Sequence, residues 1–195
     1  MPNRIDFQLK DADILYYPDF FRRKEAALFF EKLLNNTLWQ QDDITVFGKT
    51  YKQPRLTAFY ALNSNTYSYS GICMKPHGFT SELKEIKKSV ESVCDVNFTS
   101  CLLNMYRNGK DSNGWHADNE KSLGQNPVIA SVSFGAERMF HLKHRQNSEL
   151  RHKIKLEDGS LLIMKGRTQH FWLHQIPKTK KEVGKRINLT FRVIK

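Results

Sequence analysis

The segment 186–194 has the sequence RINLTFRVI, in which apolar and polar side chains alternate. Alternate residues of an extended strand lie on opposite faces. One face is therefore apolar, with Ile187, Leu189, Phe191 and Val193. The other face carries Arg186, Asn188, Thr190 and Arg192. The pattern predicts a strand over residues 187–194. Its polar face either meets solvent or lines an anion pocket, where two guanidinium groups could clamp the ends of a dicarboxylate.

The same period of two continues backwards from this strand through the second half of the chain. It predicts further strands over residues 101–107, 128–134, 138–144, 153–156, 160–165 and 168–175. The first half has two apolar faces with helical spacing. They predict helices over residues 21–36, with Asp19 as the cap, and 81–94, with Thr80 or Ser81 as the cap. Residues 45–71 are typical of hairpins. The expected fold is mainly β with flanking helices (α+β), a sandwich or jelly roll with the helices packed on one sheet.

Composition limits the class of protein. The chain has 195 residues, enough for one domain with a substantial core. An apolar content of 39% with 12% aromatic residues excludes extensive disorder. No apolar run approaches the roughly 18 residues of a membrane span. The first residues lack the apolar centre of a signal peptide, and the three cysteines show no metal-binding or disulfide spacing. We therefore expect an intracellular protein, in a bacterial cytoplasm or nucleoid or in a eukaryotic nucleus.

Positive charge is concentrated in the second half of the chain. Residues 1–97 carry 13 Lys and Arg against 12 Asp and Glu, whereas residues 98–195 carry 18 against 8. Such a basic region favours a polyanionic partner, and nucleic acid before a membrane because no basic amphipathic helix is visible there. A basic surface without a partner is the alternative.

Three residues could form a metal site. His116 and Asp118 form an HxD pair, and His174 follows within the strand predicted over residues 168–175, where it shares a face with His170 and Trp172. Two His and one carboxylate from separate strands can form the facial triad that binds Fe(II) and leaves positions open. The spacing of His170 and His174 also matches a zinc protease helix, but no Glu follows His170 and the segment favours a strand. For each histidine taken singly, a hydrogen-bonded structural role is the better interpretation, and the combination with the arginine-bearing strand favours the metal site.

Two other groups of polar residues could bind a ligand. Asn104 and Tyr106 share a face of the strand predicted over residues 101–107, from which they could hydrogen-bond a carboxylate or keto oxygen. His141, His144 and His152 lie in a basic region, which indicates a surface or phosphate-facing position and not metal binding.

Together these motifs resemble those of the AlkB-type Fe(II)/2-oxoglutarate-dependent dioxygenases. The resemblance covers roughly residues 45–195. Its motifs are NMY at 104–106, HADNE at 116–120, PVIASVSFG at 127–135, DGSLL at 158–162, HQIP at 174–177 and RINLTFR at 186–192. VFG at 46–48, PR at 54–55 and YSYSG at 67–71 are similar to the animal homologues that prefer double-stranded DNA.

The resemblance implies a double-stranded β-helix (jelly roll) around iron, preceded by an N-terminal helical and hairpin region for nucleotide recognition. It further implies a single domain, with residues 1–97 as that region and residues 98–195 as the catalytic part. His116, Asp118 and His174 would bind Fe(II). Arg186 would pair with the distal carboxylate of 2-oxoglutarate and Arg192 with the carboxylate beside the keto group. The residues that would hold the rest of the co-substrate are Asn104, Tyr106 and Asn188.

The resemblance also assigns substrate contacts. Glu120 would face the exocyclic amino group of a flipped base, Tyr69 would stack on that base opposite His116, and Phe47 would fill the gap in the duplex. Arg55, Tyr67, Lys180 and Lys181 complete the expected substrate-binding set. The chain departs from these relatives at Tyr69, where Phe is usual, and at residues 178–181, where the relatives have a richer basic run. The first change keeps a stacking face, and the second bears on the strength of backbone binding.

The implied function is oxidative DNA repair. With Fe(II), 2-oxoglutarate and O2, such an enzyme demethylates 1-methyladenine, 3-methylcytosine or etheno adducts and releases formaldehyde, succinate and CO2. The implied partner is DNA, double-stranded with a flipped alkylated base, and we expect a monomer. The alternatives are the same chemistry on RNA or protein, a zinc hydrolase, which leaves Arg186 and Arg192 without a purpose, and a non-catalytic DNA-binding β-sandwich, which does not explain the triad.

Overall fold

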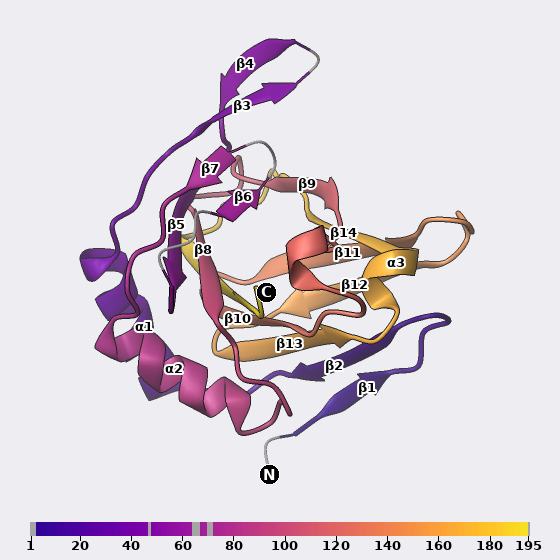
Figure 1. Ribbon diagram of the computed structural model, residues 1–195, viewed down its shortest axis with the longest axis horizontal. Helices are drawn as coiled ribbons and strands as arrows, with labels where there is room; N and C mark the ends of the chain where they lie inside the picture. The colour runs from indigo at the N-terminus through magenta and orange to yellow at the C-terminus, as the bar shows by residue number, and fades with distance from the viewer. Residues whose placement is uncertain (1–2, 47, 64–66, 70–71, 195) are drawn as a thin grey trace.

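The computed structural model describes residues 3–46, 48–63, 67–69 and 72–194 (Figure 1). Two antiparallel sheets form the body of the molecule, and the described residues include three α-helices. The fold is therefore mainly β, as the alternation of side chains predicts.

The larger sheet has seven strands in the order β1-β2-β13-β10-β15-β8-β5. Their bounds are Ile5–Phe7, Asp13–Tyr17, Ser160–Lys165, Ile129–Gly135, Arg186–Arg192, Ser100–Tyr106 and Leu56–Ala61, in the same order. The smaller sheet has the order β12-β11-β14-β9. Its strands are Arg151–Leu156, Arg138–His144, Trp172–Ile176 and Asn113–His116.

The eight strands β8 to β15 pass between the two sheets in the order of a jelly roll. β8, β10, β13 and β15 belong to the larger sheet, and β9, β11, β12 and β14 to the smaller one. This order is consistent with the double-stranded β-helix expected from the sequence. The connections β8–β9, β10–β11 and β14–β15 each cross from the larger sheet to the smaller one or back.

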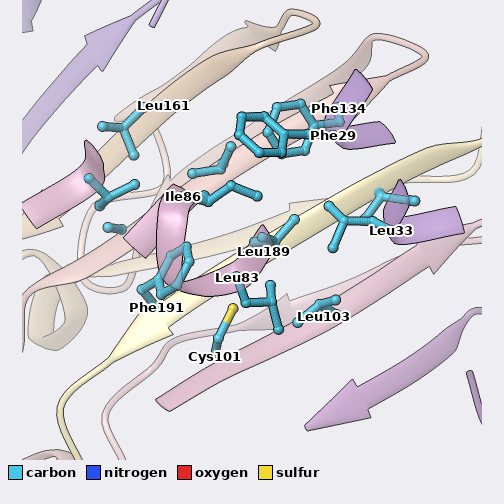
Figure 2. Close-up of a cluster of buried hydrophobic side chains, with 14 of the residues drawn as sticks. Phe29, Leu33, Leu83, Ile86, Cys101, Leu103, Phe134, Leu161, Leu189 and Phe191 are labelled. Carbon is cyan, nitrogen blue, oxygen red and sulfur yellow. The ribbon is translucent and has the colours of Figure 1, made fainter. Parts of the chain in front are cut away.

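Helix α1 (Arg23–Asn36) and helix α2 (Ser81–Glu91) cover the outer face of the larger sheet (Figure 1). Figure 2 shows the apolar side chains of both helices packed on those of β15, β8, β10 and β13. The rings of Phe29 and Phe134, for example, lie 5.8 Å apart. The apolar face of β15 points into this core, so its polar face points into the space between the two sheets.

The polar face of β15 is buried, which decides between the two interpretations of the sequence. Each of its four polar residues is less than 9% exposed: Arg186, Asn188, Thr190 and Arg192. A buried row with two guanidinium groups needs partners, because an uncompensated charge in a protein interior is costly. The solvent-exposed alternative is therefore wrong, and the anion pocket stays a prediction.

The helix caps are predicted correctly at one helix and not at the other. α2 begins after Thr80, whose hydroxyl accepts the Leu83 N–H. α1 begins at Arg23 and is capped by Arg22, whose N–H donates to the Glu25 carboxylate at 3.1 Å. Asp19 is therefore not the cap, because the capping position lies three residues further along the chain.

The strand expected over residues 168–175 is wrong in its first half. A short helix, α3 (Thr168–Phe171), precedes β14. Gly166 has φ +57°, and the Thr168 hydroxyl donates to the Lys165 carbonyl at 2.6 Å, so the chain turns where a strand was expected. His170 consequently does not share a face with His174, and its ring pairs instead with the Asn126 side chain at 3.0 Å.

The strands at the N-terminus were not predicted. β2 contains Ile14, Leu15, Tyr16 and Tyr17, all of them buried. A strand that is buried on both faces shows no alternation, so the period of two does not reveal it. Within residues 45–71, β3 (Asp43–Val46) pairs with β4 (Lys49–Lys52) as a hairpin, and β6 (Tyr67–Tyr69) pairs with β7 (Ile72–Met74). β5 instead joins the larger sheet beside β8.

The three helices in the described ranges are too short and too polar to span a membrane.

Candidate metal centre and anion pocket

His116, Asp118 and His174 converge between the two sheets. His116 ends β9, Asp118 follows it by two residues, and His174 lies on β14 directly opposite His116 in the strand pairing. One ligand atom from each residue lies within 4.8 Å of the others. Pairing of the two strands therefore assembles the triad from residues that are 58 positions apart in the sequence.

Hydrogen bonds and packing fix the orientation of each of these side chains. The Arg192 guanidinium donates to Asp118 Oδ1 at 2.8 Å, and the Asp118 N–H donates to Gln169 Oε1 at 2.9 Å. The His174 ring stacks on Phe140, with 5.1 Å between the ring centroids. His116 Nδ1 lies 2.7 Å from the Gly114 carbonyl. A carbonyl only accepts, so Nδ1 carries the proton, and Nε2, which accepts from Asn113 Nδ2 at 3.2 Å, has the lone pair that a metal would use.

The charge states of the triad suit a divalent metal ion. Burial alone would raise the pKa of Asp118, but Arg192, with smaller contributions from the two histidines, lowers that pKa to about 2. Burial, together with the neighbouring His116, lowers the pKa of His174 to about 3, and burial also lowers the pKa of His116. At neutral pH the site therefore presents one carboxylate and two neutral imidazoles, the forms that bind metal. This donor set fits Fe(II).

The predicted co-substrate residues line the same buried hollow as the triad. They come from two adjacent strands, on which Arg186 faces Tyr106 and Asn188 faces Asn104 across the β15–β8 pair. Asn188 is held by its own sheet, because its Nδ2 donates to Ser131 Oγ at 2.8 Å and to the Val132 carbonyl at 3.0 Å. The β15 and β8 strands thus bring the five predicted residues together, with Arg192 already bonded to Asp118.

Arg186 is the clearest anion-binding group in this hollow. Its side chain is fully buried, and its Nη2 donates to Ser133 Oγ at 2.9 Å. Within the described residues Nε and Nη1 have no hydrogen-bond partner. Burial lowers the pKa of Arg186 to about 10, which leaves it charged at neutral pH. Open N–H groups on a buried guanidinium match a carboxylate in charge and geometry, so the pocket fits the distal carboxylate of 2-oxoglutarate.

The residues expected to contact a nucleic acid lie at several places. Lys180 and Lys181 are exposed in the connection between β14 and β15, and Glu120 is half-buried at the start of a short 3-10 helix that follows Asp118. Tyr67 and Tyr69 belong to β6, whereas Phe47 lies outside the described residues.

Arg55 occupies an unexpected position for a residue predicted to bind substrate. It is 4% exposed, and its Nε donates to Asn104 Oδ1 at 2.7 Å. Its Nη1 also donates to the Ser112 carbonyl at 3.3 Å, just before β9. Arg55 therefore holds a wall of the pocket and turns the Asn104 amide so that its N–H2 group remains for a ligand.

Several supporting residues were missed by sequence reasoning. Ser131 and Ser133 alternate with apolar residues along β10, so the period of two could have identified them as facing the pocket. Gln169, which binds the Asp118 N–H, lies in α3, where a strand was expected. No local pattern indicates the role of Gln169, because its partner lies 51 positions away.

Comparison with known proteins gives consistent results. Residues 13–192 match the model of the 2OG-Fe(II) oxygenase superfamily. The chain is 43% identical over 186 residues to "Alpha-ketoglutarate-dependent dioxygenase alkB homolog 3" of Bos taurus, covering 91% of this chain and 64% of the relative. It is 35% identical over 188 residues to "DNA oxidative demethylase ALKBH2" of Homo sapiens, covering 91% of this chain and 72% of the relative. The chain thus spans less than two thirds of the length of the first of these relatives.

A solved structure has the same fold. "The structure of OsALKBH1" superposes with a TM-score of 0.70, covering 97% of this chain and 100% of that chain. The sequence identity is 17%, so this likeness concerns the fold alone.

Proposed function

The chain belongs to the AlkB family within the 2OG-Fe(II) oxygenase superfamily, and from this membership we propose that it oxidatively removes alkyl groups from bases in nucleic acids. One observation carries the proposal. A His-Asp-His triad and the open N–H groups of Arg186 line a single buried hollow, so a metal ion and a dicarboxylate can bind side by side.

His116, Asp118 and His174 would hold Fe(II), each in the protonation state that coordination needs. When bound, Fe(II), 2-oxoglutarate and O2 supply the oxidation that releases an N-methyl group as formaldehyde with succinate and CO2. Arg192 keeps Asp118 charged and oriented through its 2.8 Å bond. Phe140 and Gln169 restrict the movement of His174 and Asp118, so the protein fixes the geometry of the open coordination positions.

Arg186 would bind the distal carboxylate of 2-oxoglutarate in a charge-assisted pair. Arg192 would contact the carboxylate beside the keto group while it holds Asp118. Asn104 would donate from its amide N–H2 group, which Arg55 leaves for a ligand. Tyr106 and Asn188 complete the binding wall. These assignments orient the co-substrate with its keto end toward the triad.

We further propose double-stranded DNA as the substrate. Glu120 would accept a hydrogen bond from the exocyclic amino group of a flipped base, with Tyr69 stacked on that base and Phe47 in the gap left behind. An alkylated base pairs weakly, so its extrusion costs less than that of a normal base. Tyr67, Lys180 and Lys181 would contact the backbone or the base, and Arg55 would contribute through Asn104. In this proposal residues 1–97 provide recognition, residues 98–195 provide catalysis, and the protein acts as a monomer.

The test is demethylation of a matched set of oligonucleotides. Single-stranded DNA, duplex DNA and single-stranded RNA, each with one 1-methyladenine or one 3-methylcytosine, are incubated with the protein, Fe(II) and 2-oxoglutarate, and the products are measured by mass spectrometry. The proposal predicts loss of the methyl group that depends on both additions and is faster on the duplex. Faster repair of the single strand or of RNA would contradict the substrate preference. No demethylation of any oligonucleotide by a folded protein would contradict the function.

A further inference from the structure

Arg138, at the start of β11, joins three segments that connect the two sheets. Its Nη2 donates to the carbonyls of Asp111, at 3.0 Å, and Pro177, at 2.6 Å, and its Nη1 donates to the Asn108 carbonyl at 3.2 Å. Asn108 and Asp111 belong to the β8–β9 connection, and Pro177 begins the β14–β15 connection. Arg138 itself ends the β10–β11 connection. One guanidinium therefore fastens all three segments at the end of β15 that carries Arg186.

The charge of Arg138 is not balanced by an ion pair within the described residues. The side chain is 4% exposed, and its hydrogen-bond partners are neutral carbonyl groups. The nearby Asp111 carboxylate forms its bidentate pair with Arg107, at 2.8 and 2.9 Å, and attracts Arg138 without forming an ion pair with it. Burial lowers the pKa of Arg138, although a guanidinium remains protonated at neutral pH.

Tyr106 connects this charge to the co-substrate pocket. The Arg138 guanidinium lies 5.7 Å from the centre of the Tyr106 ring, and the Arg186 guanidinium lies 5.2 Å from the same ring. Tyr106 and Arg186 line the hollow, whereas Arg138 does not. Two buried cations thus lie near one aromatic ring at the end of the hollow away from Asp118, and of the two only Arg186 lines the hollow.

We infer that Arg138 is a positioning residue that selects 2-oxo acids with a second carboxylate. This inference rests on the proposed binding of 2-oxoglutarate beside Arg186. Arg138 holds Tyr106 and the connecting segments in place around Arg186, and its charge adds to the attraction for an anion at that end of the hollow. A charge in a buried environment is weakly screened, so the effect reaches a carboxylate that Arg138 does not contact. The chelating end of the co-substrate, near the triad, is insensitive to Arg138.

Two ligands of equal length distinguish an effect on the distal-carboxylate end of the pocket from an effect on the chelating end. 2-Oxoglutarate carries the distal carboxylate, whereas 2-oxovalerate has a methyl group in its place. The dissociation constants of both are measured by isothermal titration calorimetry with the protein loaded with Mn(II), which avoids turnover. The readout is the selectivity, the ratio of the two dissociation constants, in the parent protein and in three variants.

Arg138→Gln removes the positive charge and most of the hydrogen-bond donors of the guanidinium, so the selectivity should fall about tenfold. Arg138→Lys keeps a charge but replaces the planar guanidinium, which spreads its donors over two nitrogens, by a compact ammonium group, so the selectivity should fall about threefold. Arg151→Gln is the matched control, because the Arg151 guanidinium also donates to a backbone carbonyl, that of Ser148, but is exposed and does not line the hollow. It should leave the selectivity unchanged even if the melting temperature falls.

Either Arg138 variant can test the inference alone. If one variant fails to fold, the selectivity of the other still decides the outcome. Unchanged selectivity in a folded Arg138 variant would overturn the inference. Equal weakening of both ligands would also overturn it, because a purely structural role affects both ends of the pocket. If the parent protein with Mn(II) binds neither ligand, the proposed co-substrate site fails instead, which is a different outcome.

Discussion

Arg192 and Arg55 show how single residues link the metal centre to the anion pocket. Arg192 lies on the polar face of β15 and bonds to Asp118, so the ionisation of one metal ligand depends on a residue that need not touch the metal. Arg55 fixes the orientation of the Asn104 amide in the anion pocket through a hydrogen bond of 2.7 Å. The residue types of the triad and the anion pocket are visible in the sequence through their alternation. The pairings of Arg192 with Asp118 and of Arg55 with Asn104 are not visible in the sequence, because the partners lie 74 and 49 positions apart.

Arg186 offers the most direct test at this scale. Arg186→Ala removes the open guanidinium N–H groups, so half-saturation should need about tenfold more 2-oxoglutarate. The measurement is a 2-oxoglutarate titration of demethylation. Arg167→Ala is the control, because the Arg167 side chain is 63% exposed and lies outside the pocket. The same half-saturating concentration in Arg186→Ala and the parent would place the anion pocket elsewhere.

At the scale of elements, strands with one apolar and one polar face were predictable and other elements were not. β11 and β13 match their predicted bounds, and β15 differs by a residue or two. β2 is buried on both faces and α3 interrupts an apparent strand, so each conceals the periodicity that would identify it. The alternation of side chains thus indicates the strand faces that line the pocket but not the turn that brings Gln169 to Asp118.

The end of β10 should be highly sensitive to a single added carbon. Gly135 has φ +83°, and a Cβ there would lie 2.5 Å from the Phe30 ring and 2.6 Å from the Lys185 carbonyl. Gly135→Ala should therefore lower the free energy of unfolding by about 1–3 kcal/mol, measured by urea denaturation. Gly78→Ala is the control, because a Cβ at Gly78 would meet no atom within 4 Å and the φ of this residue is ordinary. Equal stability of the two variants would contradict the packing described for α1 against β10.

The β3–β4 hairpin carries the prediction that separates duplex from single-strand substrates. Phe47 follows the last residue of β3 and lies outside the described residues. If it fills the gap left by a flipped base, Phe47→Ala should slow repair of duplex DNA about tenfold, because one stacking contact is worth about 1–3 kcal/mol. Repair of the same lesion in a single strand should change little.

Tyr51→Ala provides the matched control for Phe47, because Tyr51 is an exposed aromatic residue of the same hairpin. Tyr51→Ala should leave the ratio of the repair rates on duplex and single-stranded DNA unchanged. Equal losses on duplex and single strand in Phe47→Ala, or a large fall in its melting temperature, would instead indicate that Phe47 packs in a core.

At the scale of the whole molecule, the N-terminal half is built into the same body as the basic half. β1, β2 and β5 extend the sheet that contains β15, and α1 and α2 cover its outer face. The charge remains unequal, with 18 Lys and Arg against 8 Asp and Glu in residues 98–195. The sequence therefore predicts that the partner is negatively charged. Where a nucleic acid would lie on the surface depends on the three-dimensional arrangement of the basic residues, which no local sequence pattern contains.

Lys180 and Lys181 test the electrostatic part of nucleic-acid binding. Both are exposed, so Lys180→Ala with Lys181→Ala should weaken binding of any duplex sequence to a similar degree. Each phosphate contact that is lost should reduce the slope of log affinity against log salt by about one. Fluorescence anisotropy at several salt concentrations measures this slope. An unchanged slope would show that neither lysine contacts a phosphate.

The central claim is that the triad and the anion pocket together carry out oxidative demethylation of a base. The most direct measurement is the stoichiometry of one reaction: succinate formed and methyl groups lost from a 1-methyladenine oligonucleotide, both by mass spectrometry, for the parent protein and Asp118→Ala. We expect one succinate for each methyl group lost in the parent, and neither product from Asp118→Ala, which should remain folded by circular dichroism. Methyl loss without succinate, or full activity in Asp118→Ala, would contradict the central claim.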